Sequence, residues 1–169
     1  MVKSDKTSNK IGEEIHQSPE MLSTIFDLNP DGIVLTTVPD SKIIDCNQEY
    51  LNQVGYSREE VLGHTPIELN IITPNNRNTY IKKIHDENSI SNFELKIKRK
   101  DDIYIDVLYS ARYITINDKQ LLLNIGKDIT EQKQVDRHLE EMLDKKQEIT
   151  EELQISNEEL NILKAGGVI

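Results

Sequence analysis

Apolar and polar residues follow two different patterns along the chain. Between residues 18 and 129, short apolar runs are separated by turn-forming residues, whereas residues 130–165 carry one long helical pattern. The first residues are polar and show no period, and Gly166 and Gly167 end the helical pattern. The chain is therefore predicted to contain a flexible arm, one folded domain, one long helix and a short tail, at residues 1–17, 18–129, 130–165 and 166–169.

The folded part has the signals of both strands and helices. Apolar runs and strict alternation of apolar with polar residues predict strands near residues 33–38, 43–46, 92–98, 103–114 and 121–126. Between them lie short helical patterns, with Asn47 as a candidate cap and Ser57 and Glu60 as a capping box. The predicted fold class is α+β: a five-stranded antiparallel sheet with short helices on one face, followed by a long C-terminal coiled-coil helix.

The alternation also predicts which strand residues share a face. Leu123 and Ile125 are assigned to the face that the helices cover. Tyr104, Leu108 and Leu122 are assigned to the outer face, where they are too apolar for a fully wet surface. We expect the helix around residues 21–26, from the same chain or from a partner copy, to cover them.

Composition narrows the possible functions. Thirty acidic and twenty basic residues give a formal net charge of −10, which argues against binding nucleic acid or an anionic membrane surface. The one Cys excludes a disulfide framework within the chain, and no run approaches the roughly 20 apolar residues of a membrane span. We expect a soluble, cytoplasmic protein.

Five short motifs stand at the predicted joints between elements. In chain order they are Asn29-Pro30-Asp31-Gly32-Ile33, Asp45-Cys46-Asn47, Gly55-Tyr56-Ser57-Arg58-Glu59-Glu60-Val61-Leu62-Gly63, Lys98-Arg99-Lys100-Asp101-Asp102 and Asp128-Ile129-Thr130-Glu131-Gln132-Lys133. This ordered set, over residues 19–133, resembles the PAS domain family, although Asp102 stands where a Gly is usual. The resemblance implies a sensory or protein-interaction module inside a bacterial or archaeal signalling protein.

The resemblance also implies where a small molecule would bind. Members of the family often hold a ligand or cofactor between their helices and the concave face of the sheet. Here that space would be lined by Tyr50, Val54, Leu62, Ile67, Ile71, Ile81, Ile84, Phe93, Leu95, Val107, Tyr109, Leu123 and Ile125. A solid packed core explains the same apolar pattern, and periodicity does not separate the two.

Two cofactors of the family are disfavoured by individual residues. Blue-light members resemble one another in an Asn-Cys-Arg motif whose Cys bonds flavin, but residues 65–70 contain no Cys, and Cys46 is interpreted as a packed strand residue. Haem-binding members place a His near the front of the helix predicted over 75–86, where Arg77 stands here. His85 lies at the far end of that helix and is interpreted as a surface residue. The cofactor therefore stays unknown.

Residues with catalytic or metal-binding chemistry are sparse. None of the four His residues has metal-ligand spacing to another His or to the Cys. His138 lies on the long helical pattern, as the phosphorylated His of histidine kinases does, but the Pro that usually follows it is missing. No nucleotide-binding or Ser/His/Asp pattern is present either. We expect no metal site and no enzyme activity in this chain.

The C-terminal pattern predicts a joint and a dimer. Asp128 or Thr130 is a candidate cap for the long helix, and Glu131 has the capping-box spacing from Asp128. We expect sheet movement to reach the helix there. Alternate spacings of four and three residues favour a coiled-coil homodimer over one amphipathic helix packed on its own domain. A parallel orientation is expected from function, because two input domains at one end would act on two outputs at the other. The seam, with Lys146 and Ser156 as polar exceptions, is Val135, Leu139, Met142, Lys146, Ile149, Leu153, Ser156, Leu160 and Leu163.

Together these features predict an input or relay module of a two-component sensor, with a histidine kinase as its parent. A diguanylate cyclase or a transcription regulator is the less favoured parent. The homodimer would act on a downstream kinase module or on other signalling proteins. A small-molecule ligand or a protein contact would provide the signal. The alternative is a ligand-free adaptor that only binds other proteins.

Overall fold

The computed structural model describes residues 18–167. The arm predicted at residues 1–17 and the end of the predicted tail lie outside the described residues. Contacts between residues divide the chain into two units, one up to Ile129 and one from Thr130. Each unit is described by itself.

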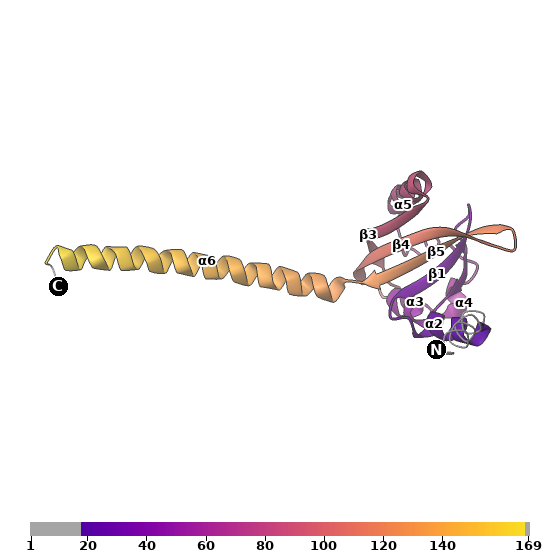
Figure 1. The fold of residues 1–169 in the computed structure, drawn as a ribbon, viewed down its shortest axis with the longest axis horizontal. Coiled ribbons are helices and arrows are strands. Elements are labelled where there is room, and N and C mark those ends of the chain that lie inside the picture. The colour runs from indigo at the N-terminus through magenta and orange to yellow at the C-terminus, as the bar shows by residue number, and fades with distance from the viewer. Residues whose placement is uncertain (1–17, 168–169) are drawn as a thin grey trace, which may run out of the picture. The chain divides into compact units, whose positions relative to one another are not determined.

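The first unit is built on a five-stranded antiparallel sheet with the spatial order β2-β1-β5-β4-β3 (Figure 1). The strands are β1 (Gly32–Thr37), β2 (Ile43–Cys46), β3 (Ser89–Lys98), β4 (Tyr104–Ile116) and β5 (Lys119–Asp128). The last strand along the chain, β5, therefore lies in the middle of the sheet, between β1 and β4. The predicted α+β class and five-stranded antiparallel sheet are confirmed.

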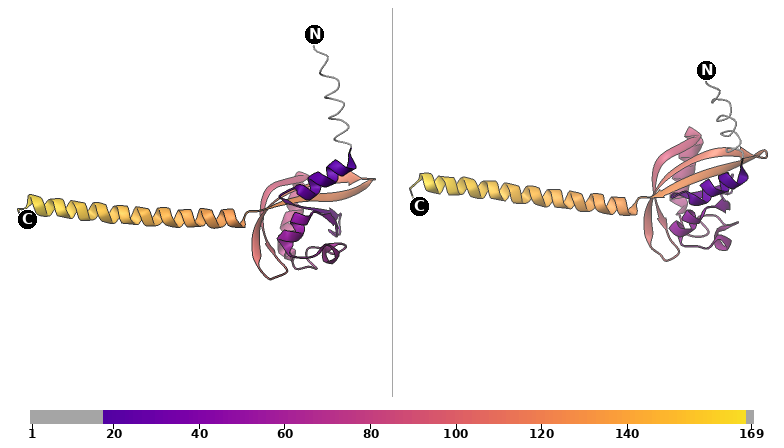
Figure 2. Two further views of the ribbon diagram at one scale, coloured as in Figure 1. Left: turned by 90° about the horizontal axis from the view of Figure 1, so that it is seen from below. Right: turned by 60° about the horizontal axis from the view of Figure 1, so that its bottom comes forward.

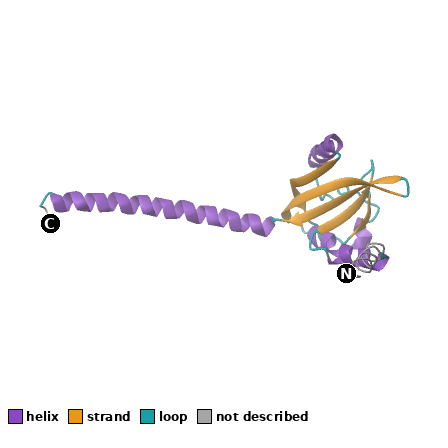
Figure 3. Ribbon diagram, in the orientation of Figure 1, coloured by secondary structure: helices purple, strands orange, loops and turns teal. Residues whose placement is uncertain are grey.

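Short helices accompany the sheet, as the colouring in Figure 3 shows. They are α2 (Pro19–Leu28), α3 (Gln48–Val54), α4 (Arg58–Val61) and α5 (Pro74–Glu87). The caps predicted at Asn47 and at Ser57 with Glu60 are confirmed. Thr73 caps α5, and Pro74 occupies its first turn, where a missing N–H costs no hydrogen bond. In space, α5 packs beside β3 and α3 beside β1, and Figure 2 shows the strands curving around α3.

The strand register corrects one part of the predicted sheet. In β5, Leu122 and Asn124 are buried and line the same cavity as Val34 of β1. Leu123 and Ile125 are on the opposite face, so the predicted face of both residues is wrong. Three consecutive leucines at residues 121–123 do not indicate which side chains face the core. The amide of Asn124 is buried, but its polarity suggests a solvent-facing position, and this reverses the predicted faces of β5.

By the same correction, Leu122 does not lie on the outer face of the sheet. Tyr104 is 57% exposed and Leu108 is half-buried in the single chain. The predicted covering helix, α2, leaves Tyr104 exposed, and its own apolar side chains Leu22 and Ile25 are exposed as well. Cover of this face by a partner copy stays a prediction.

The second unit consists mainly of one long helix, α6 (Thr130–Ala165). Its 36 residues span about 54 Å at 1.5 Å per residue, which confirms the predicted long helix. No residue of α6 is buried. The apolar residues of the predicted seam are all exposed: Val135, Leu139, Met142, Ile149, Leu153, Leu160 and Leu163.

Candidate ligand-binding site

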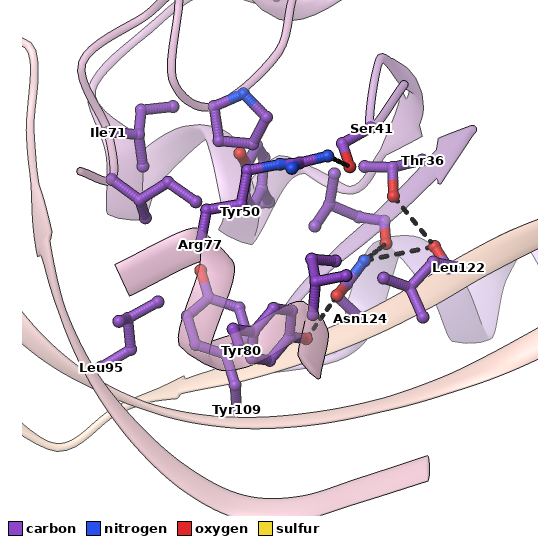
Figure 4. A pocket seen from close by; sticks show the side chains of 14 residues that line it. Thr36, Ser41, Tyr50, Ile71, Arg77, Tyr80, Leu95, Tyr109, Leu122 and Asn124 are labelled. Carbon is purple, nitrogen blue, oxygen red and sulfur yellow. Dashed lines mark hydrogen bonds between the residues drawn. The ribbon is translucent and has the colours of Figure 1, made fainter. Parts of the chain in front are cut away.

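A cavity of about 60 Å³ lies between α5 and the face of the sheet that the helices cover (Figure 4). Most of its wall is apolar, but hydroxyl, amide and guanidinium groups also reach it. The lining residues are Val34, Thr36, Ser41, Tyr50, Pro66, Ile71, Ile72, Arg77, Tyr80, Ile81, Leu95, Tyr109, Leu122 and Asn124. The cavity is thus bounded by both β1 and β5 in the middle of the sheet.

Helix α5 contributes Arg77, Tyr80 and Ile81 to the cavity. Spacings of three and four residues place these side chains on one side of a helix. Arg77 Nη2 donates a hydrogen bond to Ser41 Oγ at 2.7 Å and to the backbone oxygen of Pro39 at 3.2 Å. The guanidinium group therefore ties α5 to the turn between β1 and β2, and Figure 4 shows its side chain extending to Ser41.

A buried hydrogen bond connects α5 with β5. The Tyr80 hydroxyl donates to Asn124 Oδ1 at 2.6 Å, and both residues are buried. Asn124 Nδ2 donates to the backbone oxygens of Val34 at 3.3 Å and Leu122 at 3.2 Å. These bonds explain how an amide is accommodated inside the sheet, and they make Asn124 a polar contact between β5 and α5.

Two further tyrosines bring hydroxyl groups without protein partners to the cavity. Tyr50 is 2% exposed and Tyr109 8% exposed, and neither hydroxyl has a hydrogen-bond partner among the described residues. Burial raises the pKa of both phenols, and the nearby Tyr109 raises the pKa of Tyr50 further. Both groups are therefore neutral and able to donate a hydrogen bond to a molecule inside the cavity.

The charge around the cavity has one sign. Arg77 is its one charged lining residue, and no Asp or Glu lines it. Within the described part of the chain, Arg77 forms no salt bridge, and its Nη1 and Nε groups have no hydrogen-bond partner. A half-buried cation without a salt-bridge partner favours an anionic ligand.

The position of Tyr50 is fixed by the fully buried side chain of Asn47. Asn47 Oδ1 accepts from the backbone N–H groups of Ile33 at 2.8 Å and Tyr50 at 2.9 Å. Its Nδ2 group donates to the backbone oxygens of Phe26 at 3.0 Å and Asp31 at 2.9 Å. One amide therefore joins the end of α2, the start of β1 and the start of α3, with all its hydrogen-bonding capacity used.

The residues predicted to line this space fall into four groups. Those that line the cavity are Tyr50, Ile71, Ile81, Leu95 and Tyr109. Those that belong to the packed core or lie against it are Val54, Leu62, Ile84, Phe93 and Val107. Ile67 is half-buried. Leu123 and Ile125 lie on the opposite face of the sheet, as described above.

The other lining residues were not predicted to reach this space: Val34, Thr36, Ser41, Pro66, Ile72, Arg77, Tyr80, Leu122 and Asn124. A signal was available for two of them, since Arg77 and Tyr80 share a helix face with the predicted Ile81. The polar residues on β1 and β5 carry no such signal, because their burial depends on the strand register.

The same unit contains the one Cys of the chain. Cys46 is buried, and burial raises the pKa of its thiol to about 11, so the thiol is not activated as a nucleophile. Among residues 18–167, no group of three His, Cys, Asp or Glu side chains is arranged to hold a metal ion. Over the same range, no helix has the length and apolar character needed to cross a membrane.

The strand that passes under the cavity runs to the predicted joint. β5 ends at Asp128, and α6 starts at Thr130. Between them, the backbone N–H of Ile129 donates to the backbone oxygen of Asp106 in β4 at 2.9 Å. The predicted cap formed by Asp128 or Thr130 with Glu131 stays a prediction.

Comparisons with known proteins agree with this architecture. A protein-family model described as PAS domain matches residues 30–131. The PAS domain of an HTR-like protein from Haloarcula marismortui is 21% identical with a TM-score of 0.58, and the match covers 72% of this chain and 99% of that one. No curated protein matches the chain.

Two further solved structures show the same fold. A PAS domain from a two-component sensor histidine kinase is 11% identical with a TM-score of 0.54, covering 64% of this chain and 94% of that one. An RNA-binding light-oxygen-voltage receptor is 19% identical with a TM-score of 0.61, and the match covers 75% of this chain but 37% of the receptor. At these identities the likeness concerns the fold alone.

Proposed function

The chain belongs to the PAS domain family of sensory and signalling modules, and on that premise we propose that it is an input or relay module of a cytoplasmic two-component sensor. The parent or partner protein would be a histidine kinase. The similar fold of a PAS domain from a sensor histidine kinase supports this choice. The proposal gives the chain no catalytic step of its own.

The observation that carries the proposal is the hydrogen bond between Tyr80 and Asn124. It connects the cavity-lining helix α5 with β5, and β5 is the strand that continues into the joint and α6. A second buried bond, from Gln53 Nε2 in α3 to the backbone oxygen of Gly126 at 2.9 Å, reaches the same strand. A change in the cavity therefore has a short polar connection to the strand that leads to the output helix.

The mechanism would be a population shift between two arrangements of the sheet and the joint. A ligand favours one arrangement only by binding it more tightly than the other. In this proposal the occupied cavity changes the contacts of Tyr80 and Asn124, and β5 passes the bias through residues 128–131 to α6. The hydrogen bond between Ile129 and Asp106 lies at the point where the bias would leave the sheet.

The output would be a parallel dimer formed by α6. An isolated helix gains little stability from its own hydrogen bonds, and most helices in proteins are stabilised by packing an apolar face. The apolar side chains of the α6 seam are exposed in the single chain, Leu153 at 61% and Ile149 at 63%. A second copy of α6, packed along the seam defined above, would bury them.

The experiment that tests the proposal is native mass spectrometry of the purified chain, combined with an absorbance spectrum. A small molecule that is retained by the wild type and lost from a variant with a filled cavity, Leu122→Phe, supports sensing through the cavity. The matched control is Leu123→Phe on the opposite face, which is expected to keep the molecule. A clean apo mass for the wild type, together with a stable dimer, would instead support the ligand-free adaptor.

A further inference from the structure

We infer that the cavity under α5 binds a short monocarboxylate, such as acetate, propionate or pyruvate, through Arg77 and the hydroxyls of Tyr50 and Tyr109. This inference rests on the proposed function, because it names the ligand class of the same cavity. It is drawn from three properties of the cavity wall: its donors, its charge and its size.

The first property is an excess of hydrogen-bond donors. The hydroxyls of Tyr50 and Tyr109 have no partner within residues 18–167, although both side chains are more than nine-tenths buried and line the cavity. Among the described residues, Gln53 Oε1 is the fully buried side-chain atom without a partner. The two hydroxyl oxygens therefore stay accessible to a small molecule and can donate hydrogen bonds to an acceptor inside the cavity. The Tyr80 hydroxyl, by contrast, is already occupied by Asn124.

The second property is the charge of the wall. Arg77 is half-buried and pairs only with the neutral groups of Ser41 and Pro39 in the described structure. A guanidinium group binds a carboxylate through two parallel hydrogen bonds, which are stronger than neutral ones. Since no acidic residue lines the cavity, a cationic ligand would meet an unpaired like charge.

The third property is the size of the cavity. Its volume of about 60 Å³ exceeds the ~10–15 Å³ that one water needs and is below the ~150 Å³ of a cavity that holds benzene. A flavin or a haem does not fit this volume, whereas a carboxylate with one or two further carbons does. The apolar side chains of Ile81, Leu95 and Leu122 match its alkyl part, so a fully polar dianion such as phosphate fits less well.

The test is a titration of the full chain with sodium acetate, propionate and pyruvate, followed by NMR chemical shifts at constant ionic strength. Acetamide, which has nearly the shape of acetate without its charge, is the ligand control. We expect saturable shifts of the cavity residues with the acids and at least about tenfold weaker binding of acetamide, because hydrogen bonds to charged groups are the stronger ones.

Three variants locate the binding. Arg77→Gln should weaken carboxylate binding at least about tenfold, and Tyr109→Phe about three- to tenfold. Lys82→Gln removes an exposed cation from the same helix and should leave the affinity unchanged. If the NMR spectrum of Arg77→Gln shows that this variant is unfolded, Arg77→Lys replaces it. This variant keeps the charge without the planar guanidinium group, so it should bind the carboxylate more weakly than the wild type does.

The outcomes separate this inference from the proposed function. Equal affinity of wild type and Arg77→Gln, or shifts confined to residues outside the cavity, would overturn the carboxylate assignment. If no acid binds but native mass spectrometry finds another small molecule in the cavity, the ligand class is wrong and the sensory proposal stands. If no acid binds and no small molecule is retained, both are overturned.

Discussion

Removal of one hydroxyl group tests the connection between the cavity and β5. Tyr80→Phe deletes the oxygen that donates to Asn124 Oδ1 at 2.6 Å and keeps the ring in place. Tyr80 is 8% exposed and Asn124 6% exposed, so the lost bond is buried at both ends. A buried neutral hydrogen bond is worth about 0.5–1.5 kcal/mol net, and an acceptor left without a partner costs about 1–3 kcal/mol.

The expected loss in the free energy of unfolding is about 1–2 kcal/mol, near the low end of the cost of a buried acceptor without a partner. Asn124 keeps the two bonds of its Nδ2 group, and the cavity gives water access to the free oxygen. With a urea dependence of about 2 kcal/mol per M, the denaturation midpoint should fall by about 0.5–1 M.

Urea denaturation followed by circular dichroism measures this loss, and a double-mutant cycle with Asn124→Ala isolates the pair. We expect a coupling free energy of about 1 kcal/mol. Tyr104→Phe is the control, because Tyr104 is 57% exposed and should change stability by less than about 0.5 kcal/mol. Equal effects of the two Tyr→Phe changes, or zero coupling to Asn124, would refute the reasoning.

Three other substitutions test the packing, the buried amide and the dimer. Gly126→Ala should lower the free energy of unfolding by about 1–3 kcal/mol, because its methyl group would lie 2.9 Å from both Val107 Cγ1 and Tyr109 Cε1; unchanged urea stability would contradict this. Asn47→Asp keeps the acceptor oxygen but loses the donors to two backbone oxygens, so burial should raise the pKa of the new carboxyl. The stability of the Asn47→Asp variant relative to wild type should be highest below about pH 4 and should fall as the pH rises toward the folded-state pKa. Urea midpoints that do not depend on pH would exclude the raised pKa. Leu153→Asp should weaken dimerisation in sedimentation equilibrium and leave the spectrum of the folded domain intact, whereas an unchanged dimer would show that α6 is not the interface.

The sequence was sufficient for the elements whose signals are local. The cap at Asn47, the capping box at Ser57 and the long helix from Thr130 follow from side chains close in the chain, which act through backbone groups a few residues away. The order of strands and helices was predictable for the same reason. Lining residues such as Tyr50 and Leu95 were found because they lie on apolar faces with a clear period.

The missed residues depend on contacts between distant segments. Asn124 is polar in sequence but buried, because the register of β1 with β5 places Val34 opposite it and α5 brings Tyr80 to its oxygen. The succession of leucines before it leaves the phase of β5 undetermined. Arg77 stands where haem-binding members carry a His, but its contact with the turn at Ser41 requires the folded chain.

In the proposed mechanism, β5 connects the cavity with the joint. Amide hydrogen exchange of Ile129, whose N–H donates to Asp106 at the end of the sheet, measures this connection in the wild type and in Tyr80→Phe. Tyr56→Phe is the matched control, because the Tyr56 hydroxyl donates to the backbone oxygen of Leu69, a residue outside β5.

For an equal loss in the free energy of unfolding, Ile129 should exchange faster in Tyr80→Phe than in Tyr56→Phe. A local loss of about 1–2 kcal/mol corresponds to about 5- to 30-fold faster exchange. If Ile129 exchange rises to the same extent in both variants and follows global stability alone, β5 does not connect the cavity with the joint.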